Sequence, residues 1–190
     1  VLLDELTINK IAAGEVIERP ASVVKELVEN SIDAGATNIT VEIQNGGISK
    51  IRIIDNGSGM SKDDLEFAFE RHATSKIRKA ADLENVKSMG FRGEALASIA
   101  AIAHVELVSK TEDDNIRHKI VVEGGKILEI EDSASQKGTT ITVSNLFFNT
   151  PVRYKFLKKD FTESGYIEDV VARIALVHPE IAIKLINTGK

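Results

Sequence analysis

The first residues that could do chemistry share one stripe of a predicted helix. Pro20 opens a run that ends at Ala34 and is followed by Gly35, which is typical of a helix with proline in its first turn and glycine just past its end. At helical spacing the stripe contains three carboxyl groups and one amide, on Glu26, Glu29, Asn30 and Asp33. The opposite stripe contains Val24, Leu27, Val28 and Ser31. A ligand-binding row is one interpretation, and the solvated face of an amphipathic helix is the other.

Two glycine-containing turns could bring the backbone close to a ligand. The turn from Asp55 to Met60 ends a predicted strand and leaves a carboxylate at its tip. The turn from Gly90 to Gly93 leads directly into a helix, whose free N–H groups and dipole favour an anion such as phosphate. Each turn alone also fits a simple structural turn, and the chain has no Walker-type phosphate loop.

Several short elements must position these residues. Alternating apolar residues at 39–43 lead through Asn45-Gly46-Gly47 into a second strand at 48–54, which predicts a β-hairpin. Ser61 with Asp64 three residues later predicts a helix start. The alanine-rich segment 94–103 is apolar on nearly all sides and predicts a buried helix. Further strands are expected at 104–110, 116–123, 126–131, 139–144 and 181–186, with a helix at about 166–177.

This order of elements predicts an α+β fold. Because most strands are linked as hairpins, we expect a two-layer α/β sandwich, with helices on one face of a mixed, mostly antiparallel sheet. No repeat, low-complexity tract or proline-rich linker divides the chain, so residues 1–190 are expected to form a single domain.

The composition excludes several classes of protein. With 43% hydrophobic and 28% charged residues, it is typical of a soluble globular domain. The absence of cysteine excludes disulfide frameworks, thiolate zinc sites and cysteine nucleophiles, and the histidines show no metal-ligand spacing. No apolar run is long enough to span a bilayer, and the first five residues do not resemble a secretory signal, so we expect no membrane association.

The formal net charge of -5 means that any contact with nucleic acid would require a local basic patch. One candidate lies between Arg71 and Arg92. The second combines Arg153, Lys155, Lys158 and Lys159 with Phe147, Phe148, Tyr154 and Phe156. Basic residues beside aromatic ones suit contacts to phosphates and bases. The alternative is a solvated helix face with a few core phenylalanines.

Four motifs, in order along the chain, resemble those of the GHKL ATPase superfamily, which includes gyrase B, the Hsp90 chaperones, histidine kinases and MutL. They are Glu29-Asn30-Ser31-x-Asp33-Ala34, Asp55-x-Gly57-x-Gly59, Gly90-x-x-Gly93-Glu94 and Gly138-Thr139-Thr140. Longer strings at 9–17, 71–76, 90–96 and 148–153 look like the MutL family of DNA mismatch-repair proteins. The resemblance runs from about Leu6 to the C-terminus and implies the family's N-terminal GHKL ATPase domain.

The resemblance implies a Mg²⁺-dependent ATPase and assigns roles within it. Glu29 matches the general base, and Asn30 matches the Mg²⁺ ligand. Asp55 matches the acid that accepts a hydrogen bond from the adenine amino group, with Thr140 assisting through its hydroxyl and a bound water. Asp33 would order the base side of the nucleotide or nearby water. The segment from His72 to Gly93 matches the family's ATP lid.

The remaining residues expected to bind nucleotide lie in the two glycine turns and in this lid. They are Gly59, Met60, Thr74, Ser75, Lys76, Gly90, Phe91, Arg92 and Gly93.

The resemblance also implies partners and a larger protein. It implies a second MutL-type subunit that joins by ATP-driven dimerisation, a MutS-type mismatch-recognition protein, DNA, and a cytoplasmic or, in a eukaryote, nuclear location. Residues 3–16 would form the dimer-contacting arm. In the family a second domain supplies a lysine to the γ-phosphate, so we expect residues 1–190 alone to bind ATP better than they hydrolyse it. The alternatives are a nucleotide-gated binding module with negligible hydrolysis, or another GHKL ATPase.

Overall fold

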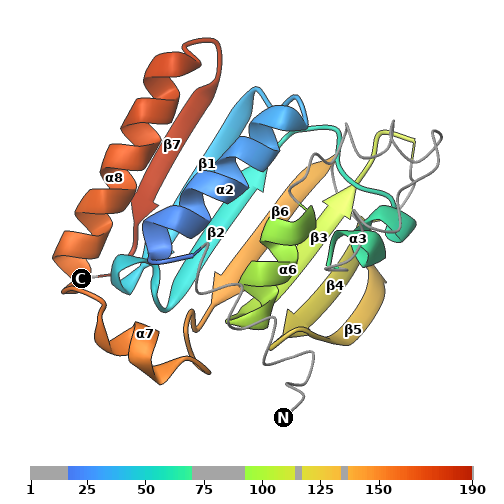
Figure 1. The fold of residues 1–190 in the computed structure, drawn as a ribbon. Helices are drawn as coiled ribbons and strands as arrows, with labels where there is room; N and C mark the ends of the chain where they lie inside the picture. Colours follow the sequence, from blue (N-terminus) through green and yellow to red (C-terminus); the bar gives the residue numbers. More distant parts are fainter. Residues whose placement is uncertain (1–16, 70–92, 114–116, 134–136, 190) are drawn as a thin grey trace.

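The computed structural model describes residues 17–69, 93–113, 117–133 and 137–189. Within these residues one seven-stranded sheet has the order β5-β4-β3-β6-β2-β1-β7 (Figure 1). Its strands are β1 (Asn38–Gln44), β2 (Lys50–Asp55), β3 (His104–Lys110), β4 (Arg117–Glu123), β5 (Lys126–Ser133), β6 (Gly138–Ser144) and β7 (Ala182–Asn187). All neighbouring pairs are antiparallel except β1 with β7, which confirms the expected mixed, mostly antiparallel sheet.

The helices complete a two-layer arrangement. They are α2 (Pro20–Asp33), α3 (Lys62–Ala68), α6 (Gly93–Ala101), α7 (Pro151–Lys155) and α8 (Asp160–Val177), with a 3-10 turn η1 at Asn45–Gly47. Figure 1 shows α2, α6 and α8 side by side on the same face of the sheet. The predicted fold class is therefore confirmed.

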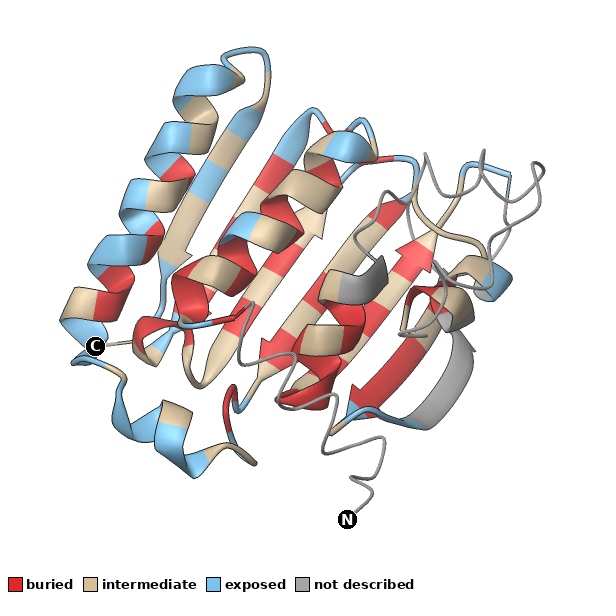
Figure 2. Ribbon diagram, in the orientation of Figure 1, coloured by how far each residue is buried: buried red, intermediate tan, exposed pale blue. Residues whose placement is uncertain are grey.

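Helix α2 follows its amphipathic pattern closely. Pro20 occupies the first turn, where its missing N–H costs nothing, and Gly35 follows the helix with a φ of 77° that suits glycine. The buried side of the helix consists of Pro20, Ala21, Val23, Val24, Leu27, Val28 and Ser31. The stripe opposite is partly or fully exposed, as the sequence predicted (Figure 2).

The core lies between the helices and one face of the sheet. Side chains of β1, β2, β3 and β6 alternate between buried and partly exposed along each strand, as expected when only one face is covered. Ile53 pairs with Ile141, and Asp55 pairs with Thr139, across the β2–β6 ladder. This register aligns the ends of β2 and β6 beside the C-terminal end of α2.

Two helices near the C-terminus differ from expectation. Helix α8 begins at Asp160, six residues before the predicted start at 166, and the short helix α7 was not predicted. The first turn of α8 contains Asp160 and Glu163, which favour a helix N-terminus. Glu163 is buried at 1% exposure beside Arg19, 3.6 Å away, so the extra turns of α8 pack against the start of α2. Such a tertiary contact leaves no periodic pattern in the local sequence.

The helices of the described residues include none that is both long enough and apolar enough to cross a membrane. The segment 3–16 and the basic patch between Arg71 and Arg92 lie outside the described residues.

Candidate functional site

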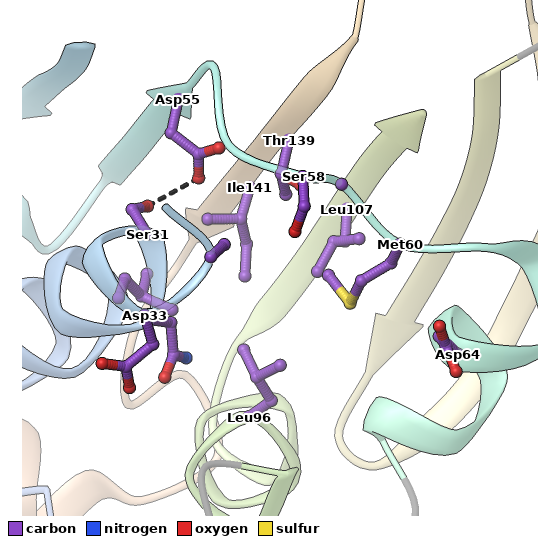
Figure 3. Close-up of a pocket in the computed structure, with 14 residues that line it drawn as sticks. Ser31, Asp33, Asp55, Ser58, Met60, Asp64, Leu96, Leu107, Thr139 and Ile141 are labelled. Atoms are coloured by element: carbon purple, nitrogen blue, oxygen red, sulfur yellow. Dashed lines mark hydrogen bonds between the residues drawn. The ribbon is translucent and has the colours of Figure 1, made fainter. Parts of the chain in front are cut away.

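A pocket opens between α2, α6, α3 and the ends of β2, β3 and β6 (Figure 3). Its lining residues are Leu27, Asn30, Ser31, Asp33, Ala34, Asp55, Ser58, Gly59, Met60, Asp64, Leu96, Leu107, Thr139 and Ile141. The volume is about 140 Å³, well above the roughly 10 to 15 Å³ that a single water needs. Half of these residues are apolar or glycine and half carry polar side chains, so the pocket combines apolar walls with groups that can orient a ligand.

Asp55 is the most constrained polar group of the pocket. The Ser31 hydroxyl donates a hydrogen bond of 2.6 Å to Oδ2 of Asp55, and the Gly57 N–H donates one of 2.8 Å to Oδ1. The backbone of Thr139 also donates to this carboxyl group. Burial raises the pKa of Asp55 above its ordinary value of 3.8, and these hydrogen bonds only partly offset that effect. The carboxyl group is thus fixed in place at the end of β2, with lone pairs left for a ligand.

The turn after Asp55 is pinned on both sides. The Ser58 N–H donates to the carbonyl of Ala34 at 2.9 Å, and the Met60 N–H donates to Oγ of Ser109 at 2.7 Å. Gly59 has a φ of 74°, and a Cβ at this position would overlap the carbonyl group of Lys110. Glycine is therefore required for the turn to lie against β3.

The polar stripe of α2 is divided between the pocket and its rim. Asn30 and Asp33 line the pocket, whereas Glu29 is partly exposed and is not among the lining residues. The Oδ1 atom of Asn30 is buried and accepts no hydrogen bond within the described part of the chain. A buried oxygen without a donor is costly, so Asn30 is suited to receive a ligand or a cation.

The two threonines of β6 face opposite sides of the sheet. Thr139 and Ile141 line the pocket, and Thr140 between them does not. Side chains alternate along a strand, so the hydroxyl that reaches the pocket belongs to Thr139. The apolar residues Ile141 and Val143 share the face of Thr139, so alternation along the strand distinguishes the two threonines, and the pairing of Thr139 with Asp55 agrees.

The expected phosphate-binding residues belong to the segment 74–93. Thr74, Ser75, Lys76, Gly90, Phe91 and Arg92 lie outside the described residues, and Gly93 is the first residue of α6. Conversely, Asp64 was predicted only as part of a helix start, whereas in the structure it lines the pocket at the opposite end from Asp55 (Figure 3). Ser31 lies on the apolar stripe of α2, and both its place in the pocket lining and its bond to Asp55 make it part of the site.

The site is thus a pocket between helices and a mostly antiparallel sheet, with a fixed aspartate at a strand end. The sequence profile of the histidine kinase-, DNA gyrase B-, and HSP90-like ATPases matches residues 17–145, and the chain belongs to this family.

Within that family the chain is similar to MutL proteins. It is 58% identical over 189 residues to the DNA mismatch repair protein MutL of Caldanaerobacter subterraneus subsp. tengcongensis, covering 100% of this chain and 32% of the relative. It is 56% identical over 188 residues to MutL of Bacillus cytotoxicus, covering 99% of this chain and 29% of the relative. The chain therefore spans about a third of the length of these relatives, and the similarity to MutL predicted from the motifs is confirmed.

Solved structures agree with this assignment. The MutL ATPase domain of Aquifex aeolicus complexed with ADP superposes with a TM-score of 0.75 at 38% identity, covering 92% of this chain and 62% of that one. The N-terminal domain of a DNA repair protein superposes with a TM-score of 0.81 at 33% identity, covering 99% of this chain and 55% of that one.

Proposed function

We propose that this chain binds ATP in the pocket between α2, α6 and the sheet and hydrolyses it as the N-terminal ATPase domain of a MutL-type mismatch-repair protein. The observation that carries the proposal is Asp55, held by Ser31 and Gly57 so that it faces the pocket of a chain from this ATPase family. An acceptor at this point suits the amino group of adenine, whereas guanine would bring a carbonyl oxygen there. The ADP complex of the Aquifex aeolicus domain supports an adenine nucleotide.

Mg²⁺ would accompany the nucleotide. The described residues contain no group of three or more histidines or acids arranged to hold a metal. Mg²⁺ typically keeps several waters and binds through one or two protein oxygens and the phosphates. The buried, unpaired Oδ1 of Asn30 offers the kind of hard oxygen ligand that this ion prefers. When bound, Mg²⁺ would neutralise charge on the phosphates.

Glu29 is the candidate general base, next to Asn30 on α2. Its partly exposed side chain could accept a proton from a water that attacks the γ-phosphate. Asp33, which lines the pocket, would order the nucleotide or its water. On β6 we propose Thr139, in place of Thr140, as the hydroxyl beside the base. Residues of the segment 72–93 would cover the triphosphate.

Calorimetry with a non-hydrolysable ATP analogue tests the binding site. The analogue should bind more tightly with Mg²⁺ than without it, and a GTP analogue should bind more weakly. Asp55→Ala should reduce the affinity for the ATP analogue by about tenfold or more, because it removes a hydrogen bond to a charged acceptor. Absence of any nucleotide binding by the folded protein would overturn the proposal.

Turnover requires a separate test, because a lysine from a following domain is expected to contact the γ-phosphate. In a protein that includes this domain, Glu29→Gln should reduce turnover by about 10² to 10⁴ while leaving analogue binding nearly unchanged. Loss of binding together with turnover would instead assign Glu29 to nucleotide binding.

The proposed partners follow from mismatch repair by MutL-type proteins. They are a second MutL-type subunit recruited by ATP, a MutS-type recognition protein, and DNA, in the cytoplasm of a bacterium or the nucleus of a eukaryote. The segment 3–16 is the proposed contact with the second subunit.

Exposed aromatic and basic residues around α7 offer a surface for DNA. Tyr154 and Phe156 are 55% and 77% exposed, and Lys155, Lys158 and Lys159 are exposed beside them, whereas Phe147 is a core residue at 1%. Lys159→Ala should weaken binding to DNA of any sequence and reduce the salt dependence, as expected for a phosphate contact. Sequence-dependent weakening would contradict a phosphate contact.

A further inference from the structure

Ser109 on β3 is completely buried and contacts two residues that line the pocket, Met60 and Thr139. Its Oγ atom has three close polar neighbours, each of which belongs to the site or adjoins it. The Met60 N–H lies 2.7 Å away, the carbonyl oxygen of Gly138 3.1 Å away and Oγ1 of Thr139 2.7 Å away. Ser109 thus connects the turn after β2 with the threonine that lines the pocket.

Only one placement of the protons satisfies all three contacts. Met60 offers an N–H and can only donate, and the Gly138 carbonyl can only accept. A serine hydroxyl has a single proton, so the bond to Gly138 uses it. The remaining contact is satisfied only if the Thr139 hydroxyl donates its own proton to Ser109.

This placement determines which hydrogen bonds Thr139 can offer to a ligand. Because its proton points to Ser109, the Thr139 hydroxyl presents only lone pairs to the pocket. Asp55, when ionised, also presents only lone pairs. The end of the pocket between these two side chains therefore requires hydrogen-bond donors from whatever binds there.

We propose that Ser109 is a positioning residue for base selection, which fixes the Thr139 hydroxyl as a hydrogen-bond acceptor. The inference rests on the proposed function, in which an adenine nucleotide occupies this pocket. The adenine amino group supplies donors, whereas hypoxanthine has a carbonyl oxygen at the same position. Without Ser109, the Thr139 hydroxyl can rotate and donate to that oxygen, so discrimination against hypoxanthine should fall.

The test compares two nucleotides of nearly identical shape, non-hydrolysable analogues of ATP and of inosine triphosphate, by calorimetry. The wild-type protein should prefer the ATP analogue. Ser109→Ala should reduce that preference by about three- to tenfold, the effect of one neutral hydrogen bond. If Ser109 had a purely structural role, its loss would weaken binding of both analogues equally and leave the ratio of their affinities unchanged.

Three further variants keep the test decisive. Ser144→Ala on β6, which removes a hydroxyl outside the pocket, should leave the ratio at its wild-type value. Ser109→Cys nearly preserves volume but bonds poorly, so it should reduce the ratio and can replace Ser109→Ala if that variant does not fold. In Thr139→Val, which lacks the hydroxyl through which Ser109 acts, the ratio should also fall, and adding Ser109→Ala should change it no further.

A ratio within about twofold of the wild type in a folded Ser109 variant, or in Thr139→Val, would overturn the inference even if the ATP analogue binds well. Failure of the wild-type protein to bind either analogue would overturn the proposed function and this inference with it.

Discussion

The carboxyl group of Asp55 is largely removed from water, and this burial disfavours its ionised form. Desolvation raises its pKa, and the hydrogen bonds from Ser31, Gly57 and Thr139 lower it by less. Groups perturbed in this way are common where a protein binds or transforms a ligand. Ionisation of Asp55 is therefore less favourable in the folded protein than in the unfolded chain.

The raised pKa predicts a pH dependence of stability. Below pH 3.8, the ordinary pKa that applies in the unfolded chain, Asp55 is protonated in both states and contributes no pH dependence. Between that value and the raised folded pKa, the folded state keeps a proton that the unfolded state has lost. The Asp55 contribution to stability therefore falls as pH rises through this window, by at most about 1.4 kcal/mol per pH unit.

Urea unfolding of the wild type and of Asp55→Asn, at a series of pH values, isolates this contribution. The wild type should lose stability relative to Asp55→Asn as pH rises through the window, and the difference should be constant above it. A difference that is independent of pH, or one that favours the wild type as pH rises, would contradict the raised pKa.

At the scale of elements, the turn between β2 and α3 is fixed by one close backbone contact. Gly59 and Gly35 have nearly the same φ, 74° and 77°, but differ in surroundings. A Cβ on Gly59 would overlap the Lys110 carbonyl, whereas one on Gly35 would meet nothing within 4 Å. Gly35→Ala should lower the free energy of unfolding by about 1 to 2 kcal/mol, because alanine is strained at this φ. Gly59→Ala should lower it by about 1 to 3 kcal/mol more, because its Cβ also overlaps the Lys110 carbonyl.

Urea unfolding of both alanine variants measures this difference. Equal losses of stability would mean that the turn can move away from β3 at little cost. A larger loss for Gly59→Ala, together with weaker nucleotide binding, would show that the contact shapes the pocket.

The start of α2 is joined to α8 by a partly buried ion pair. The guanidinium of Arg19 lies 3.6 Å from the carboxylate of Glu163 and 4.2 Å from the centroid of the Tyr166 ring, and Glu163 is 1% exposed. Arg19→Ala would leave a buried carboxylate without its cation, so it should destabilise the protein by about 1 to 3 kcal/mol.

Arg173 provides the matched control for Arg19. Its ion pair with Asp169 is shorter, at 3.0 Å, but both side chains are more than half exposed. Arg173→Ala should therefore change the unfolding free energy by less than about 0.5 kcal/mol. Comparable effects of the two substitutions would show that burial of Glu163 does not strengthen its pair with Arg19.

At the scale of the whole molecule, the nucleotide should act as a stabilising contact between the two layers. The pocket is lined from α2, α3, α6 and three strands, so a bound ligand contacts elements far apart in the sequence. At about 100 times its dissociation constant, a ligand adds about 2.7 kcal/mol of stability. For a chain of 190 residues, this should raise the thermal midpoint by about 5 to 10 °C.

Thermal scans with the ATP analogue, with and without Mg²⁺, test this expectation. Asn30→Ala should keep part of the nucleotide-induced shift but lose the increment that depends on Mg²⁺. An undiminished Mg²⁺ increment in Asn30→Ala would contradict the assignment of Asn30 as a metal ligand.

Local patterns predicted most of the elements. Proline before an amphipathic run and glycine after it predicted α2. Alternating apolar and polar residues on both sides of Asn45-Gly46-Gly47 predicted the β1–β2 hairpin. The Ser61 cap is present, since its side chain accepts a bond from the Asp64 N–H at 3.3 Å. These features depend on neighbours within a few residues, which the sequence displays directly. Helix α8 was predicted too short because its first turns depend on the distant Arg19.

The sequence by itself determined the family, the fold class and the position of Asp55 at a strand end, because ordered motifs and periodic patterns are local properties. Only the tertiary structure decided which atoms meet in the pocket. The register of β6 against β2 and β3 places Thr139 opposite both Asp55 and Ser109, and the meeting of β3, β6 and the Met60 turn gives Ser109 its three partners. Alternation within one strand shows which side chains share a face, but which residues of neighbouring strands meet is decided only when the strands pair.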